Sequence, residues 1–177
     1  MALSRDDLEL PDEQLLKRCD VHIYKASGPG GQHRNKVSSA VRLRHRETGI
    51  TAHGDDSRSQ HENKRLAIKR LRMNFALQIR RPVDPETPPS ERLGEFLLPP
   101  PKGLQQRRLQ IGRKNPQFWQ VAAVLLDELE ACEGRIGEAA GRIGVTTGNL
   151  VRTLSADRHL LAAAQEVRRK HGHRPIS

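Results

Sequence analysis

The sequence predicts an α+β domain, in which a small sheet packs on one long helix, followed by a separate all-helical module. In the first part, apolar residues alternate with polar ones and then recur at helical spacing up to residue 80. A proline-rich stretch separates this part from a second stretch with helical spacing. We therefore expect an N-terminal extension over 1–19, the α+β domain over 20–80, a linker over 81–115 and the helical module over 116–177.

The expected sheet rests on three short segments. Val21 and Ile23 predict a strand with both side chains on one face. Val41 and Leu43 alternate with polar residues and predict a half-buried second strand. Residues 47–49, Glu-Thr-Gly, are typical of a hairpin connection, with the glycine where a left-handed residue fits, and the next residues begin the returning strand.

Helical spacing identifies the remaining elements. One stripe predicts a long basic helix from about residue 60 to 80, formed by Ile68, Leu71, Phe75 and Ile79. Seven of the chain's 11 prolines lie within 81–115, which argues against a helix or central strand there. In 116–177 we expect several helices, with a break at Gly144, a cap at Thr146 or Thr147, a cap at Asp157 and an end at Gly172. The helices around Gly144 have the spacing of a helix-turn-helix, and a plain helical bundle explains that spacing equally well.

Charge is concentrated in one block of the chain. The whole chain carries a net charge of +10, and residues 25–80 hold 13 Lys and Arg against 4 Asp and Glu. Such a block is typical of a protein that binds a phosphate backbone, and a solvated basic surface is the alternative.

The longest apolar run, 121–126, has six residues and cannot span a bilayer. The acidic first 13 residues argue against a targeting segment, and two cysteines fit a reduced, cytoplasmic protein.

A glycine loop interrupts the basic block at Gly28-Pro29-Gly30-Gly31-Gln32. It matches neither the Walker pattern nor the dinucleotide pattern, while G-x-x-G fits the backbone clamp of KH domains, which remains a rival. Two glycines allow a backbone to approach a ligand with no side chain between them. The backbone N–H that follows can then donate a hydrogen bond to an oxyanion. Gln32 takes up no proton near neutral pH, so chemistry here needs water as the nucleophile.

Two separated segments resemble a known family. Residues 26–33, with Asn35-Lys36 and Ser39-Ala40-Val41, and then 58–64, Arg-Ser-Gln-His-Glu-Asn-Lys, resemble the catalytic domain of class I peptide chain release factors. The resemblance covers about 20–80. It implies hydrolysis of the peptidyl-tRNA ester at the peptidyl transferase centre of the large ribosomal subunit.

The resemblance also implies roles for individual residues. Gln32 coordinates water and stabilises the transition state through its backbone N–H, while Gly30 and Gly31 permit the loop geometry. Gln32 is expected to be N-methylated by a glutamine methyltransferase. We expect ribosomal RNA contacts from the basic and polar residues around the loop. For the four from 58 to 64, the resemblance implies that they either contact RNA or brace the domain. These residues are Lys25, His33, Arg34, Asn35, Lys36, Arg58, Gln60, Asn63, Lys64 and Arg65.

The chain departs from the family pattern in places. Arg34 replaces an apolar residue, Lys25 replaces arginine, and Pro29 is a tolerable change. About 20 residues precede the domain, which leaves no room for a stop-codon-reading half. The chain therefore resembles the short, codon-independent hydrolases that rescue ribosomes, with stalled whole ribosomes and split large subunits both open as substrates.

Two other functions remain open from the sequence. One is a non-catalytic protein that binds ribosomal RNA or tRNA, against which the retained Gln32 argues. The other is a helix-turn-helix regulator, in which Thr147, Asn149 and Arg152 contact nucleic acid. We expect no cofactor, no membrane partner and a monomer, and no metal because the eight histidines match no zinc pattern.

Overall fold

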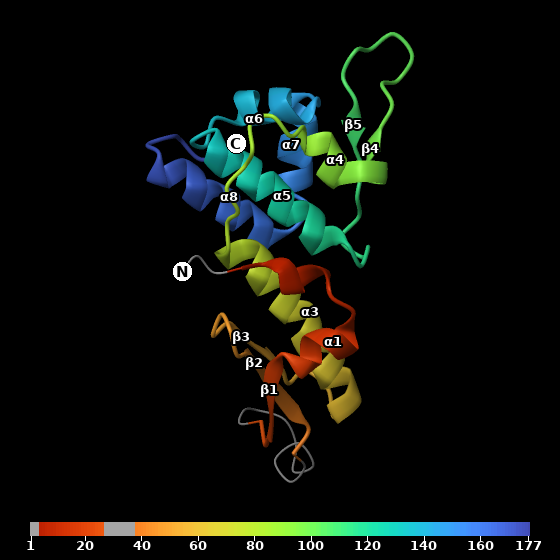
Figure 1. Ribbon diagram of the computed structural model, residues 1–177, viewed down its shortest axis with the longest axis vertical. Helices are drawn as coiled ribbons and strands as arrows, with labels where there is room; N and C mark the ends of the chain where they lie inside the picture. The colour runs from red at the N-terminus through yellow and green to blue at the C-terminus, as the bar shows by residue number, and fades with distance from the viewer. Residues whose placement is uncertain (1–3, 27–37) are drawn as a thin grey trace. The chain divides into compact units, whose positions relative to one another are not determined.

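The computed structural model describes residues 4–26 and 38–177. It divides into two compact units, Met1–Ile79 and Arg80–Ser177. The first unit contains a three-stranded sheet and one long helix, and the second contains helices and a two-stranded sheet (Figure 1). The predicted α+β fold followed by a helical module is confirmed. Among the helices in the described part of the chain, none has both the length and the apolar character needed to cross a membrane.

The sheet of the first unit is an antiparallel meander. Strands β1 (Cys19–Tyr24), β2 (Ala40–His45) and β3 (Thr51–Gly54) lie in the order β1-β2-β3. The hairpin between β2 and β3 forms as predicted, with Gly49 at a φ of 71° and His45 N–H donating to the Ile50 carbonyl over 2.8 Å. Gly49 therefore occupies the left-handed conformation that the turn requires.

Helix α3 (Gln60–Gln78) covers β2 and β3. Ser59 caps its N-terminus by accepting a hydrogen bond from the N–H of Glu62. The predicted stripe is confirmed, since Ile68, Leu71, Phe75 and Ile79 are all buried. β3 approaches α3 so closely that a Cβ on Gly54 would lie 1.8 Å from the Asn63 carbonyl oxygen. Only glycine fits at this crossing, because real Cβ contacts under 3.0 Å essentially do not occur.

The edge strand β1 presents two apolar side chains that are only partly covered. Val21 and Ile23 share one face, as expected, and they pair in register with the buried Leu43 and Val41. They remain 42% and 48% exposed, however, because α3 lies over β2 and β3 and does not extend over β1.

Residues 4–19, within the expected N-terminal extension, pack against the rest of the first unit. Helices η1 (Asp6–Glu9) and α1 (Asp12–Lys17) bury Leu8 and Leu15. Arg72 of α3 donates to the Leu8 and Leu10 carbonyls and pairs with Asp12 at 2.7 Å.

A buried pair adds a second attachment for this segment. Asp7 accepts a hydrogen bond from His45 Nε2 over 2.8 Å, and the His45 ring packs edge-on against Phe75. The Nδ1 of His45 faces the N–H and the hydroxyl of Thr48, so the ring proton belongs on Nε2. These contacts join residues far apart in sequence, which is why local patterns did not reveal them.

Residues 81–115 also differ from the prediction, because they fold as part of the second unit. Helix α4 (Pro89–Leu93) starts on a proline, which suits a first helical position because the missing N–H has no partner there in any case. It continues into η2 (Gly94–Phe96), and strands β4 (Leu97–Leu98) and β5 (Arg108–Leu109) then form a hairpin whose loop extends away from the helices (Figure 1). The linker prediction failed because prolines 99–101 lie in this hairpin loop.

Four helices complete the second unit: α5 (Phe118–Ala131), α6 (Ile136–Ile143), α7 (Thr147–Leu154) and α8 (Arg158–Lys170). α5 is buried on nearly all sides, and its Asp127 and Glu128 pair with Arg92 and Arg142 at 3.0 and 2.9 Å. The helix boundaries follow the predicted signals. Gly144 is left-handed at a φ of 86°, Gly172 lies just beyond α8, and Thr146 and Asp157 cap α7 and α8.

The crossing at Gly54 yields a stability prediction. We expect Gly54→Ala to lower the free energy of unfolding of the first unit by at least about 3 kcal/mol, because the new carbon meets helix backbone. Gly49→Ala is the matched control, since open space surrounds Gly49 and only its positive φ opposes the change, at about 1 kcal/mol. Urea denaturation followed by circular dichroism measures both. Equal losses in the two variants would contradict the close approach.

Candidate functional site

The glycine loop connects two neighbouring strands at one end of the sheet. Tyr24 ends β1, Ala40 begins β2, and the two are register partners, so both ends of the connection lie side by side. Ala26 and Ser39, which flank the loop, are each only 6% exposed. The predicted catalytic residues lie outside the described residues, as do their basic and polar neighbours; these are Gly30, Gly31, Gln32, His33, Arg34, Asn35 and Lys36.

The C-terminal end of this connection is held by a buried asparagine. The side-chain amide of Asn63 donates to the carbonyls of Ser39 and Ser57, both over 2.8 Å. Its Oδ1 accepts from the N–H of Ser57 over 2.9 Å. Asn63 itself is fully buried. One side chain in the first turn of α3 therefore fixes both the end of the loop and the segment that leads into the helix.

This position corrects the expectation that Asn63 contacts RNA. A fully buried amide with three main-chain partners has no surface to offer a ligand. Of the two roles left open for residues 58–64, Asn63 therefore has the bracing one. Sequence spacing alone could not distinguish the two roles, because asparagine is common both at surfaces and in buried turns.

The other predicted residues near the loop are accessible. Lys25, Arg58, Gln60 and Arg65 are exposed and Lys64 is half-buried. Arg65 pairs with Glu62 at 3.2 Å, whereas no carboxylate in the described part of the chain pairs with Lys25, Arg58 or Lys64. Lys25 flanks the loop, Arg58 lies in the connection before α3, and Lys64 and Arg65 lie in the first two turns of α3. Because Asn63 joins this connection to Ser39, these cations add positive charge near the ends of the loop.

The open face of the sheet, opposite α3, carries further basic residues that the sequence analysis did not select. Arg42 and Arg44 of β2 are exposed there, and His22 and His53 are the register partners of Arg42 on either side. His53 also lies 3.1 Å from the Tyr24 hydroxyl. The alternation of arginine with buried Val41 and Leu43 was the available signal.

The cysteines are unsuited to nucleophilic chemistry. Burial raises the pKa of Cys19 to about 11, and its thiol donates to the Leu15 carbonyl over 3.2 Å. Burial likewise raises the pKa of Cys132. Both thiols are therefore protonated near neutral pH. In residues 4–26 and 38–177, no group of three or more His, Cys, Asp or Glu side chains could hold a metal ion.

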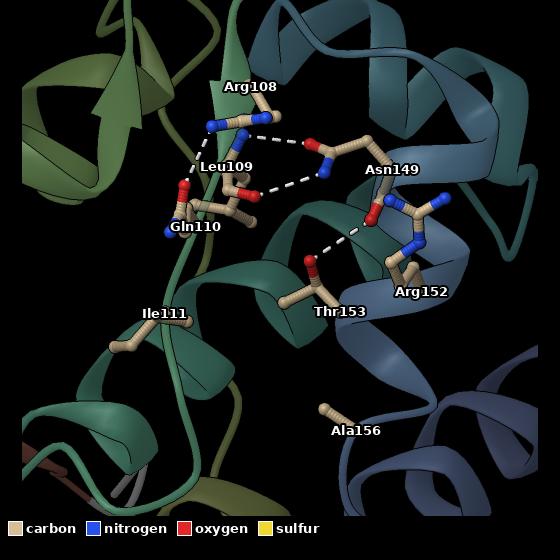
Figure 2. A pocket seen from close by; sticks show the side chains of 8 residues that line it. All are labelled: Arg108, Leu109, Gln110, Ile111, Asn149, Arg152, Thr153 and Ala156. Atoms are coloured by element: carbon tan, nitrogen blue, oxygen red, sulfur yellow. Dashed lines mark hydrogen bonds between the residues drawn. The ribbon is translucent and has the colours of Figure 1, made fainter.

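The predicted nucleic-acid contacts of the second unit have different environments. Thr147 and Arg152 are exposed on α7. The Asn149 amide instead binds both main-chain groups of Leu109 in β5, at 2.8 and 3.0 Å (Figure 2). Asn149 therefore joins the hairpin to α7, and its amide is not available to read a base edge.

Comparison with known proteins identifies the first part of the chain. Residues 8–93 match the family model described as the RF-1 domain. Peptide chain release factor 2 of Borreliella burgdorferi is 55% identical over 62 residues, which are 34% of this chain and 17% of that protein. Peptide chain release factor 1 of Rickettsia massiliae is 44% identical over 86 residues, which are 49% of this chain and 23% of that protein. Residues 8–93 are thus similar to the RF-1 domain of peptide chain release factors.

The match confirms the resemblance to the class I release factor catalytic domain and extends it. The matched residues include most of the N-terminal segment, the sheet, the glycine loop and α3, and the match ends at the last residue of α4. The chain spans only about a fifth of the length of these curated relatives, at 17% and 23%.

The Asn63 contacts yield a second prediction. Asn63→Asp removes the N–H donors, so that the introduced carboxylate faces two carbonyl oxygens. We expect the free energy of unfolding to fall by roughly 3 kcal/mol at neutral pH. The free energy of unfolding should fall by less at pH 5, because the introduced carboxyl is then protonated more often and can donate a hydrogen bond to the carbonyl of Ser39 or Ser57.

Gln60→Glu is the control for this change, because it adds the same charge at an exposed position in the first turn of α3. A carboxylate is tolerated there, near the positive end of the helix dipole. Urea melts at the two pH values measure both variants. A destabilisation that is equal in the two variants would refute the role given to Asn63.

Proposed function

We propose that this protein hydrolyses the ester bond of peptidyl-tRNA on the large ribosomal subunit, without reading a codon. The observation that carries the proposal is the Gly30-Gly31-Gln32 sequence within the RF-1 domain, a domain shared with peptide chain release factors. The frame of β1, β2 and α3 supports it, because Asn63 and the paired strands fix both ends of the loop that carries these residues.

The proposed chemistry uses water as the nucleophile. Water attacks the ester carbonyl carbon, and negative charge develops on the carbonyl oxygen. The bond to the tRNA 3′ oxygen then breaks, and that oxygen leaves with a proton. The Gln32 backbone N–H would donate to the developing charge, and the absence of side chains at Gly30 and Gly31 would allow the backbone to approach. The step needs no cofactor.

Residues near the loop and the binding partner belong to the same proposal. We propose that Lys25, Arg58, Gln60, Lys64 and Arg65 contact large-subunit RNA, since four of them are exposed and Lys64 is half-buried. Gln32 is proposed as the target of a glutamine methyltransferase. We place the protein in the cytoplasm, as a monomer, with the ribosome as its partner.

We also propose that release does not depend on a codon. The second unit lies almost entirely beyond the RF-1 match and supplies a folded module with its own basic surface. A helix-turn-helix regulator is less favoured, because the side-chain amide of Asn149 is hydrogen-bonded to the main chain of Leu109 and cannot contact a base. A non-catalytic RNA-binding role leaves the Gly-Gly-Gln sequence without a purpose.

Removal of the glycines tests the catalytic assignment. We expect Gly30→Ala and Gly31→Ala each to slow peptide release from purified ribosomal complexes by about 100- to 1,000-fold, the usual loss of one oxyanion donor. Ribosome binding, measured by co-sedimentation, should be largely kept. Gly112→Ala, at an open position with no neighbour within 4 Å, serves as the control and should release peptide normally. Near-normal release by both loop variants would exclude the catalytic assignment.

The choice of substrate tests codon independence. We expect wild-type protein to release peptide from complexes with truncated mRNA, from complexes with a sense codon or from split large subunits, at rates unaffected by a stop codon. The same purified peptidyl-tRNA is used in every complex, so that only the ribosomal state differs. Release that requires a stop codon would contradict this part of the proposal.

A further inference from the structure

A groove runs along the second unit between β5 and α7. Two adjoining hollows of about 320 and 210 Å³ share Arg108, Asn149 and Arg152 in their walls. The larger hollow continues along Ile111 and Thr153, as Figure 2 shows, and the smaller one continues toward the hairpin loop.

The groove is held open by main-chain contacts. Asn149 binds both main-chain groups of Leu109, and the N–H of Arg107 donates to the Gly144 carbonyl over 2.9 Å. The Thr153 hydroxyl in turn donates to the Asn149 carbonyl over 3.0 Å. The hairpin is thus joined to both the turn before α7 and the helix itself, so the walls keep their spacing without a ligand.

Positive charge in the groove is not neutralised. Arg107, Arg108 and Arg152 are exposed, and none of them pairs with a carboxylate among the residues that the structure describes. The sequences of both walls explain this, because 96–126 and 139–156 contain no Asp or Glu. The polar contact of Arg108 is to the neutral Gln110 side chain at 2.9 Å.

Three other arginines of the same unit are paired with carboxylates. Arg92 bridges Asp127, Arg142 bridges Glu128 and Arg113 bridges Asp157, at 3.0, 2.9 and 3.2 Å. The acidic residues near the groove are therefore engaged elsewhere. Three unpaired guanidinium groups lie along one preformed channel.

We propose that this groove binds the phosphodiester backbone of RNA. Guanidinium groups form paired hydrogen bonds with phosphate oxygens, and three of them along a channel suit a chain of phosphates better than a single anion. The choice of RNA over DNA rests on the proposed function in translation. The charge and shape of the groove do not depend on that function.

The groove favours backbone contacts over base reading. A recognition helix presents several side chains to base edges. On α7 the exposed positions are Thr147, Gly148 and Arg152, and Asn149 faces β5. Arg152 is thus the one long polar side chain on that surface, which predicts RNA binding with little sequence preference.

The test replaces the three arginines together in the full chain. The variant Arg107→Gln/Arg108→Gln/Arg152→Gln is compared with Arg135→Gln/Arg158→Gln/Arg169→Gln, which removes the same charge from exposed sites of the same unit outside the groove. Fluorescence anisotropy measures binding to a short RNA hairpin of arbitrary sequence over a range of KCl concentrations. We expect the groove variant to bind about tenfold more weakly or worse, with a salt slope reduced by about 2 to 3. The control should stay close to wild type.

Further arms of the experiment identify the ligand. Cross-linking of the hairpin through 4-thiouridine should label peptides from 103–113 or 146–156 in wild type and not in the groove variant. Equal loss of RNA binding in both triple variants would overturn the proposal, as would displacement of the RNA by polyglutamate of equal charge. Sequence-selective binding of a DNA duplex, lost in the groove variant, would overturn it in favour of a DNA-binding module.

The two proposals fail separately. If wild-type protein releases no peptide but the groove variant loses RNA binding, the hydrolase is wrong and the groove stands. If release is normal and RNA binding does not change in the groove variant, the groove is wrong and the hydrolase stands.

Discussion

The contact between β3 and the first turn of α3 determines the geometry of the RF-1 domain. At Gly54 the strand lies so close to the Asn63 carbonyl that no side-chain carbon fits between them. The same asparagine uses its side chain to hold Ser39 and Ser57, the ends of two connections that meet at this point. One buried junction therefore holds the sheet and the helix together and fixes Ser39, which precedes β2.

The two units place positive charge in different ways. In the RF-1 domain, accessible cations surround the ends of the loop and the open face of the sheet, while Arg72 and Arg70 are paired with acidic groups. In the second unit, acidic residues pair with Arg92, Arg113 and Arg142, while the three arginines of the groove pair with no carboxylate among the described residues. A protein that acts on the ribosome with both surfaces would gain affinity from the second contact without a change in chemistry, because the linked site raises the effective concentration.

Local sequence patterns predicted those features that depend on near neighbours. The stripe from Ile68 to Ile79, the left-handed Gly49, the break at Gly144 and the caps at Thr146 and Asp157 were all predicted, because each requires only residues within a few positions. The anchoring of residues 4–19 by Arg72 and His45 could not be predicted, since those partners lie about 40 to 60 residues away. The same applies to Asn149 and Leu109. The prolines of 81–115 suggested a stretch without helices or strands, because only their number entered the prediction. Their positions allow both, since Pro89 begins a helix and 99–101 lie in a hairpin loop. The candidate site was predicted from the Gly30-Gly31-Gln32 motif. The bracing role of Asn63 became clear only from its burial in the structure.

The most direct measurement of the central claim, that a rigid frame presents the loop for catalysis, is the single-turnover rate of peptide release by Asn63→Ala. The variant is assayed at a temperature where circular dichroism shows it folded, at saturating enzyme, with ribosome affinity measured in parallel. Loss of the amide frees Ser39 and Ser57, so the account predicts a release rate well below that of wild type with affinity largely retained. A folded variant that releases peptide at the wild-type rate would contradict it.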